Sequence, residues 1–509
     1  MNYLIDINII LDYFDRERRE KFNESISVFD ILYNSDNNIY ISSSSLDNIA
    51  FLKTSALKEA YGYSIREAKN ITNAMIENLL LRFQLAPTPS YIEIDYEDIE
   101  DSQIIASAKA IDAKVITRDK GMLKKYKEIA LSPKLFLEQK DIPNNIDFAN
   151  LKKQYFMYKQ EIEEAMDRVL NNSAYIMGEA VTSLEKNLKA YTGAKYAITC
   201  SSGTDALLLA MMALDIEPDD EVITTPFTFI ATAETIAFLG ATPVFVDIDE
   251  KTYNIDVDKI EEKITPKTKA IMPVSLYGQP ANMDRIQAIA KRHNLKVIID
   301  GAQSFGSTYN GISDSNLGDI STTSFFPAKP LGCFGDGGAV FTNNEKLAIK
   351  MKSLRVHGQT KRYHHKYIGM GGRMDALQCA VVDVKLKYYP KDLALRQEVA
   401  SRYRQALEDK NILLPSIDRD ATSAYAQYSV RVKNRDAVQV KLKEMGIPTA
   451  VHYPMPLHLQ ECFGYLGYKR GDFPIAELVS SEIMSLPMNP YLSDEEIEYI
   501  AQKLFIAIK

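Results

Sequence analysis

The chain has 509 residues, of which 46% are apolar and 25% are charged, the composition of a globular protein with room for about three domains. The net charge of −8 argues against a nonspecific binder of nucleic acid or of anionic membrane surfaces, because such binders need a strong positive field. We expect no signal peptide and no membrane span, since no apolar run approaches roughly 18 residues. The four cysteines are widely spaced without a CxxC pair, which favours reduced thiols and a cytoplasmic location.

Residues 1–131 alternate short apolar strands with helical segments. Strands are expected at 3–5, 39–41 and 115–117, and a helix at 102–111. This alternation predicts an α/β/α layered fold for a first domain. The polar segment 132–145 contains two prolines and an Asn-Asn pair, so it is expected to be a linker.

Three acids stand near strand or helix ends in this first domain. Asp6 follows the first strand, Asp101 opens a helix, and Asp119 follows the strand at 115–117. Each of them alone is more often a cap or a turn residue. If they converge, their oxygens are suited to Mg²⁺ or Mn²⁺ and to metal-assisted hydrolysis of a phosphodiester.

The order and spacing of these acids resemble a PIN domain of the VapC-like ribonuclease type. The resemblance implies a metal site at Asp6, Asp101 and Asp119, with RNA as a partner. Asn48 stands where the family has another acid, and an amide supplies an oxygen but no charge. Two alternatives therefore stay open for this domain. It is either a metal-dependent nuclease, with the rest of the chain as a sensor, or a non-catalytic interaction or oligomerisation module.

The second block begins near residue 146 and again alternates strands with helices. The expected strands lie at 197–199, 221–224, 243–246, 270–274 and 297–299. Strands joined by crossover helices predict a mostly parallel sheet, which binds ligands at the carboxyl ends of its strands. We expect a large domain over 146–385 and a smaller α+β domain over 386–509 that closes over the site.

Four features of this block follow one another in the order that an enzyme using pyridoxal phosphate (PLP) needs. The turn 201–205 joins a strand to a helix and offers backbone N–H groups to a phosphate. Phe229 follows the next strand and is suited to cover a flat ring. Asp300 ends a strand, and Lys329 precedes closely spaced glycines. A lysine forms a Schiff base with the PLP aldehyde, while an acid keeps the pyridine nitrogen protonated. Each feature alone is more often structural, but together they predict a PLP enzyme.

Residues 146–509 resemble the DegT-type sugar aminotransferases, PLP enzymes of fold type I that aminate keto groups on nucleotide-linked sugars. The matching segments include SSGTDALLLA at 201–210, FTFIATAETI at 227–236, DGAQSFG at 300–306 and RMDALQ at 373–378. The segments KPLGCFGDGGA and VHYPMPLH look most like the subgroup that aminates UDP-2-acetamido-2-deoxy-3-oxo-glucuronate in O-antigen synthesis. Because Lys329 is retained, the resemblance implies transamination, with glutamate as donor, and not the dehydration catalysed by relatives that have histidine there.

The resemblance also implies a role for each matched residue. Lys329 would hold PLP and move the proton between cofactor and sugar, and Asp300 would pair with the pyridinium nitrogen. The other cofactor contacts would be Gly203, Thr204, Asp205 and Ser324 at the phosphate, Phe229 on the ring and Gln303 near the phenolate. The nucleotide-sugar would be bound by His357, His364, Arg373, His452 and Tyr453, partly across the interface of a homodimer. Gly371 replaces the asparagine with which many relatives reach the neighbouring subunit's phosphate, so that contact is expected to be absent or made by a backbone N–H.

Overall fold

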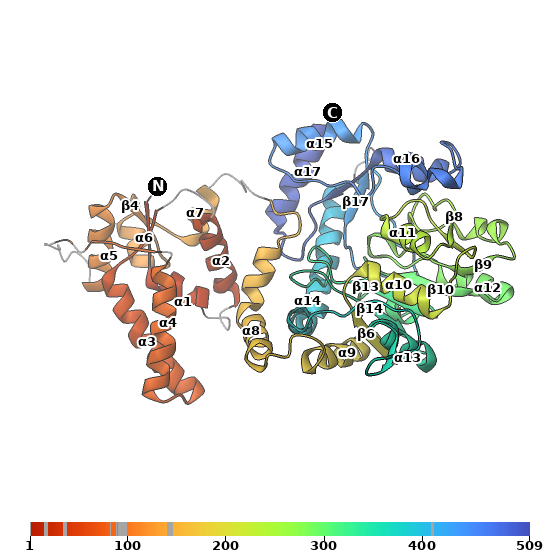
Figure 1. The fold of residues 1–509 in the computed structure, drawn as a ribbon. Coiled ribbons are helices and arrows are strands. Elements are labelled where there is room, and N and C mark those ends of the chain that lie inside the picture. The colour runs from red at the N-terminus through yellow and green to blue at the C-terminus, as the bar shows by residue number, and fades with distance from the viewer. Residues whose placement is uncertain are drawn as a thin grey trace. The chain divides into compact units, whose positions relative to one another are not determined.

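The computed structural model describes residues 2–14, 19–33, 38–81, 83–87, 89, 99–139, 146–408 and 412–509. The chain divides into two compact units, Met1–Pro143 and Asn144–Lys509. Figure 1 shows both units, and each is described by itself below. Among the described residues, no helix combines the length and the apolar character needed to cross a membrane.

The first unit is built on a parallel five-stranded sheet of order β3-β2-β1-β4-β5. Its strands are β1 (Asn2–Ile5), β2 (Asn38–Ile41), β3 (Gln84–Leu85), β4 (Ala113–Ile116) and β5 (Ala130–Leu131). Its helices are α1 (Ile7–Phe14), α2 (Arg19–Tyr33), α3 (Ser43–Tyr61), α4 (Ile65–Leu80), α5 (Ile99–Ala110), α6 (Lys120–Lys125) and α7 (Pro133–Gln139). Leu4 and Ile5 of the central strand are fully buried, as expected when helices cover both faces of a parallel sheet. The strands expected at 3–5, 39–41 and 115–117 correspond to β1, β2 and β4.

Helices α3 and α4 form a hairpin that extends away from this sheet (Figure 1). Ser42 caps the start of α3 by accepting the N–H of Ser45, and Gly62 ends it in the left-handed conformation with φ 69°. Ser64 and Glu67 form a reciprocal capping box at the start of α4. Side-chain caps therefore set the start of each helix, and the backbone of a left-handed glycine sets the end of α3.

The segment 132–145 differs from the linker expected from its composition. Residues Pro133–Gln139 form helix α7, and Phe136 is 1% exposed. The ring of Phe136 packs edge-on against Tyr3 of β1, with ring centroids 5.2 Å apart. Burial of one large aromatic side chain outweighs the turn-forming tendency of its polar neighbours, so 133–139 belong to the first unit.

The second unit contains a seven-stranded sheet of order β6-β14-β13-β10-β9-β7-β8, in which only β14 runs antiparallel to its neighbours. Its strands are β6 (Tyr196–Cys200), β7 (Glu221–Thr224), β8 (Thr242–Phe245), β9 (Thr268–Ile271), β10 (Lys296–Asp300), β13 (Ile320–Ser324) and β14 (Gly338–Thr342). Its helices are α8 (Leu151–Asn172), α9 (Glu179–Thr192), α10 (Gly203–Ala213), α11 (Ala231–Phe238), α12 (Met283–His293) and α13 (Glu345–Leu354). The mostly parallel sheet predicted from the sequence is thus present, and we call it with its helices the large lobe.

A small lobe follows the large one. It consists of α14 (Ala376–Ala406), the antiparallel pair β17 (Tyr428–Arg431) and β18 (Ile483–Leu486), and α15 (Arg435–Glu444), α16 (Pro474–Glu482) and α17 (Asp494–Ile508). Helix α14 runs unbroken through the boundary expected at 385/386 and continues past Pro390. Ile146 lies in the same buried cluster as Leu504, so the start of the second unit packs into the small lobe.

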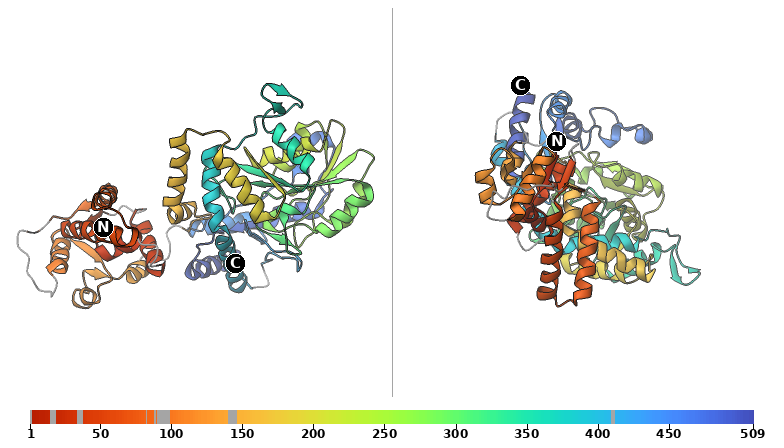
Figure 2. Two further views of the ribbon diagram at one scale, coloured as in Figure 1. Left: turned by 90° about the horizontal axis from the view of Figure 1, so that it is seen from below. Right: turned by 90° about the vertical axis from the view of Figure 1, so that its left-hand side faces the viewer.

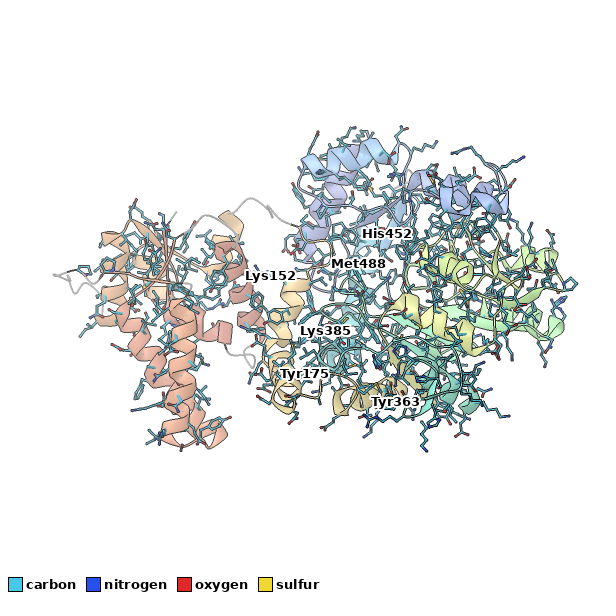
Figure 3. The ribbon with its side chains drawn as sticks, in the orientation of Figure 1. Lys152, Tyr175, Tyr363, Lys385, His452 and Met488 are labelled. Carbon is cyan, nitrogen blue, oxygen red and sulfur yellow. The ribbon has the colours of Figure 1, made fainter. Side chains whose placement is uncertain are left out.

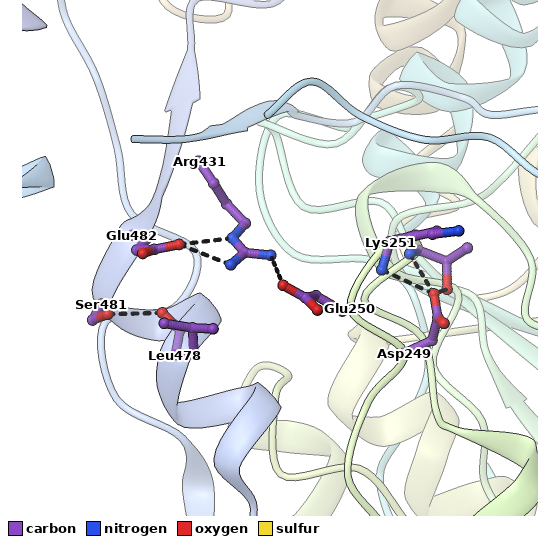
Figure 4. Close-up of polar contacts among 8 residues, drawn as sticks. Asp249, Glu250, Lys251, Arg431, Leu478, Ser481 and Glu482 are labelled. Atoms are coloured by element: carbon purple, nitrogen blue, oxygen red, sulfur yellow. Dashed lines mark hydrogen bonds and ion pairs between the residues drawn. The ribbon is translucent and has the colours of Figure 1, made fainter. Parts of the chain in front are cut away.

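An ion-pair bridge connects the two lobes. Arg431 of β17 donates to Glu482 of the small lobe at 2.8 Å and to Glu250 of the large lobe at 3.1 Å (Figure 4). The Arg431 side chain is 4% exposed, whereas Glu250 is 54% exposed. The arginine is therefore held inside the protein by one carboxylate from each lobe.

Candidate active site

The predicted cofactor residues converge because four strands end at the same edge of the large sheet. Strands β6, β7, β10 and β13 run in the same direction, so their carboxyl ends lie together. The turn 201–205 follows β6, Phe229 follows β7, Asp300 ends β10 and Ser324 ends β13. Lys329 lies in the loop between β13 and β14. This edge is where open α/β sheets bind ligands.

The turn after β6 is too tightly packed for a side chain at its centre. A Cβ atom on Gly203 would lie 2.7 Å from the Cβ of Ser324, and one on Gly338 would lie 2.4 Å from the carbonyl oxygen of Ser202. Ser202 caps α10 by accepting the N–H of Asp205 at 3.0 Å. The close approach of this turn to β13 sets the first N–H groups of α10 beside Ser324. A helix N-terminus with free N–H groups and a positive dipole end is suited to a phosphate.

Asp300 is buried without a charged hydrogen-bonding partner. It is 5% exposed, and its carboxylate accepts the Thr232 hydroxyl at 2.7 Å and the N–H of Ala302 at 3.2 Å. Burial raises the pKa of Asp300, while these two hydrogen bonds and the charge of Lys329 oppose the rise. A protonated ring nitrogen is the kind of cation that would stabilise this carboxylate, so the residue fits a PLP pyridinium.

Lys329 lies close enough to Asp300 for the two charges to interact. Burial lowers the pKa of Lys329, and the charge of Asp300 partly offsets that fall. Its own backbone N–H donates to the carbonyl of Phe326 at 2.9 Å, which closes a turn under the side chain. A lowered pKa increases the fraction of the amine that is neutral, and the neutral amine is the nucleophile that attacks an aldehyde.

Gln303 is oriented by a backbone group on a neighbouring loop. The N–H of Tyr277 donates to Gln303 Oε1 at 2.7 Å, so Gln303 Nε2 points the other way and donates to the Tyr453 hydroxyl at 3.1 Å. The Tyr453 ring lies 6.0 Å from the ring of Phe229, centroid to centroid. Phe229 is 54% exposed although it follows a buried strand. An exposed aromatic face beside polar groups is suited to stack on a flat heterocycle.

His452 joins the same group from the segment before β18 (Figure 3). Its Nδ1 lies 2.9 Å from the hydroxyl of Ser485. Burial, together with the nearby positive charge of Lys329, lowers the pKa of His452 to about 4. The imidazole is therefore neutral at physiological pH and adds no charge next to the lysine.

The remaining predicted substrate residues lie on or near a separate hairpin in the sequence 357–373. Strands β15 (Gln359–Lys361) and β16 (His364–His365) pair antiparallel, and the hairpin projects from the body of the second unit (Figure 2). His357 and His364 are exposed there, whereas Arg373 is partly buried. Their role in binding the nucleotide-sugar across a dimer stays a prediction.

The glycine at 371 has a local explanation. A Cβ atom there would lie 3.2 Å from Cε1 of His357, so the imidazole fills the space beside Gly371. An asparagine at this position would require that ring to move. The glycine at position 371 thus leaves room for the imidazole of His357.

Two contributors to the site carry no local sequence signal. Thr232 is 68 positions from Asp300, to which it donates, and Tyr277 is 26 positions from Gln303. Threonine and tyrosine are ordinary residues in such segments, and only the pairing of neighbouring strands brings them to the acid and the amide.

The acids of the first unit do not form a visible metal site. Asp6 is 2% exposed and accepts the Thr117 hydroxyl at 2.7 Å, while Asp119 caps α6 by accepting the N–H of Met122 at 2.6 Å. Asp101 lies in the first turn of α5. Among the described residues, no three Asp, Glu, His or Cys side chains gather closely enough to hold a metal ion. The predicted metal site is therefore left without support.

Comparison with known proteins agrees with this geometry. The model of the DegT/DnrJ/EryC1/StrS aminotransferase family matches residues 157–505. The chain is 48% identical over 359 residues to UDP-2-acetamido-2-deoxy-3-oxo-D-glucuronate aminotransferase of Pseudomonas aeruginosa, covering 70% of this chain and 99% of that protein. It is 44% identical over 357 residues to dTDP-3-amino-3,6-dideoxy-alpha-D-galactopyranose transaminase of Aneurinibacillus thermoaerophilus, covering 70% and 98%.

Solved structures show the same fold. The crystal structure of NtdA from Bacillus subtilis with bound cofactor PMP superposes with a TM-score of 0.67 at 31% identity, covering 77% of this chain and 93% of that one. The prediction of a fold-type I aminotransferase is confirmed for the second unit. This chain therefore belongs to the DegT/DnrJ/EryC1/StrS aminotransferase family.

Proposed function

We propose that this protein is a PLP-dependent aminotransferase that aminates the C3 keto group of a nucleotide-linked sugar. One observation carries the proposal. The buried acid Asp300, whose hydrogen-bonding partners are neutral, and Lys329, whose pKa is lowered, lie at the same edge of the sheet. The 48%-identical relative is named for a UDP-linked 3-oxo-glucuronate, and we infer a substrate of that kind. We further infer that glutamate is the amino donor and that the product enters surface-polysaccharide synthesis, such as that of O-antigen.

Each residue of the site has a distinct task. The bound PLP would supply an electron sink for the carbon that loses a proton. Asp300 would hold the ring nitrogen protonated, and the start of α10 would bind the phosphate. Lys329 has the reach and the lowered pKa to take a proton from one carbon and return it to another. Gln303 directs its Nε2 to the Tyr453 hydroxyl, and Phe229, whose ring is next to that of Tyr453, offers the surface for stacking.

The test is a substrate panel. UDP- and dTDP-linked sugars with keto groups at C3 or at C4 are incubated with glutamate, and the products are identified by mass. We expect the C3-keto UDP-sugar to gain the mass change of amination, and Lys329→Ala to lose both this product and the absorbance of lysine-bound PLP. A wild-type protein that takes up no PLP, or that aminates only C4-keto sugars, contradicts the proposal.

We also propose that the active protein is a cytoplasmic homodimer with shared sites. The exposed hairpin that carries His364, with the exposed His357 just before it, favours this assembly, since both histidines are expected to bind a substrate that Lys329 must also reach. Sedimentation of the full chain gives the mass of the assembly. Mixed dimers of Lys329→Ala and Arg373→Ala subunits should regain activity only if the sites are shared.

For the first unit we propose two alternatives. Asp6 and Asp119 follow the neighbouring strands β1 and β4, which favours a metal-dependent ribonuclease. The hydrogen bond of Asn48 to Glu100 at 2.5 Å engages the amide that stands where the resemblance expects another acid, which favours a non-catalytic interaction module. RNA cleavage with Mg²⁺ or Mn²⁺ that is lost in Asp6→Asn supports the nuclease. Cleavage absent with both metals, together with altered assembly but unchanged transamination after removal of residues 1–140, supports the module.

A further inference from the structure

A lysine is buried beneath the loop that carries Lys329. Lys385 of α14 is 3% exposed, and its Nζ donates to the carbonyl oxygen of Gly332 at 2.8 Å (Figure 3). The same Nζ lies 4.5 Å from the ring centroid of Phe334, within the range of a cation–π contact. Both contacts are to residues of the loop between β13 and β14, three and five positions beyond Lys329.

This loop is closed on itself at its base. The N–H of Phe325 donates to the carbonyl of Gly337 at 2.8 Å, and the N–H of Cys333 donates to the carbonyl of Phe325 at 2.7 Å. The Cys333 thiol also contacts the carbonyl of Phe325 at 2.9 Å. Residues 325–333 therefore form a ring-like segment with Lys329 at its centre.

Helix α14 holds the base at two points. Gln378 Oε1 accepts the N–H of Phe334 at 2.8 Å, while Lys385 binds the carbonyl of Gly332. Gln378 and Lys385 are seven positions apart, which places them on one face of the helix two turns from each other. The residues on either side of Cys333 are thus each tied to the same rigid helix.

The burial of a charge at this position calls for a reason. Burial lowers the pKa of Lys385 to about 8, and the nearby Cys333 and Asp392 oppose that fall. An apolar side chain of the same length would fill the space without the desolvation of an ammonium group. What the ammonium adds is a charge-assisted donor to the Gly332 carbonyl and an attraction to the Phe334 ring.

We propose that Lys385 is a positioning residue for the catalytic lysine. It fixes the Gly332 carbonyl and the Phe334 ring to α14, and so it holds the backbone from which Lys329 reaches the two carbons between which a proton moves. This inference rests on the proposed aminotransferase function for its effect on catalysis. The contact itself is a property of the protein before cofactor or substrate binds.

The test compares three full-length variants. Lys385→Met removes the donor and the charge, Lys385→Gln keeps a donor without charge, and Lys391→Met changes an exposed lysine on the same helix as a control. Amide hydrogen exchange is followed in the peptide 326–334 of the cofactor-free protein. We expect exchange about tenfold faster in Lys385→Met, an intermediate rate in Lys385→Gln, and the wild-type rate in Lys391→Met.

Kinetics of the cofactor-loaded protein give the second measurement. In Lys385→Met we expect kcat to fall about tenfold while KM for the nucleotide-sugar stays within about twofold, because the loop aims Lys329 and does not bind sugar. Exchange in Lys385→Met equal to that in Lys391→Met overturns the proposal, whatever the activity. If the exchange rates differ as expected but the wild-type protein does not transaminate, the positioning role of Lys385 is supported and the proposed aminotransferase function fails.

A fourth variant, Phe334→Leu, is used if Lys385→Met does not fold. Phe334→Leu removes the ring under the ammonium from the loop side, at a position that is 41% exposed. We expect faster exchange in the same peptide, by a smaller factor than in Lys385→Met. An unchanged rate in both Phe334→Leu and Lys385→Gln refutes the positioning role.

Discussion

Replacement of Gly203 by alanine tests how the phosphate turn is built. The added Cβ would lie 2.7 Å from the Cβ of Ser324 and 3.1 Å from its Oγ. Carbon atoms in contact lie about 3.5–4.0 Å apart, so roughly 1 Å of movement is required. Ser324 ends β13, which is paired on both sides with β10 and β14. The strand is held, and the start of α10 is what must move.

The expected cost follows from that displacement. Overpacking of this kind costs about 1–3 kcal/mol, and the better helix propensity of alanine returns at most about 1 kcal/mol. The net cost is then up to about 3 kcal/mol, and over a unit of the size of Asn144–Lys509 the melting temperature should fall by up to about 4 °C. Binding of PLP should suffer more, because the N–H groups of α10 leave their positions at the phosphate. Loss of one hydrogen bond to a charged group, worth about 1.5–3 kcal/mol, weakens PLP binding roughly 10- to 100-fold.

The assay measures melting temperature without cofactor and then the dissociation constant of PLP by absorbance titration. Gly464→Ala is the matched control, because a Cβ atom there has no neighbour within 4 Å. We expect the control to match the wild type in both measurements. If Gly203→Ala also matches it, the turn is not held against β13 and the phosphate assignment fails.

Two further predictions concern buried ionisable side chains in the second unit. Arg355 is 3% exposed and donates to Glu185 at 2.6 Å and to the carbonyl of Thr199 at 2.7 Å. Arg355→Met leaves the Glu185 carboxylate without its charged partner, so the free energy of unfolding measured by chemical denaturation should fall by about 3–5 kcal/mol. A fall of less than about 1 kcal/mol contradicts this prediction. His452 binds a proton near pH 6.5 in the unfolded chain but only near pH 4 when folded, so the free energy of unfolding should fall as pH falls from 6.5 to 4. In the cofactor-free protein, this part of the pH dependence of the free energy of unfolding should be absent from His452→Gln. An equal pH dependence in the variant and the wild type would refute the prediction.

Much of the active site was predictable because its residues carry local signals. Asp300 follows an apolar strand, the turn 201–205 links a strand to a helix, and Lys329 precedes a glycine cluster. The spacing of apolar residues predicts each strand, and the end of a predicted strand places its last residue at the carboxyl edge of the sheet. The partners of these residues were not predictable in the same way. Thr232 and Lys385 come from helices whose sequences show only that they are buried.

Two elements show how packing changes a local expectation. The segment 132–145 has the prolines and asparagines of a linker, yet Phe136 finds a buried place against Tyr3 and half of the segment becomes helix α7. Pro390 would be expected to end a helix, because it lacks an N–H. Helix α14 nevertheless continues to Ala406, with Tyr389 and Val399 buried on either side of the proline. In both places the burial of large side chains outweighs backbone preference.

The sequence by itself predicted the two-part organisation, the mostly parallel sheet of the second unit and the proposed roles of Lys329 and Asp300. These depend on periodicity and on residue type, which are properties of short segments. Only the tertiary structure decided that the carboxylate of Asp300 has neutral partners, that Gln303 turns its Nε2 toward Tyr453, and that Lys385 donates to a carbonyl of the loop that carries Lys329. The physical reason is that pKa and orientation depend on groups distant in sequence, which meet only when strands pair and helices pack.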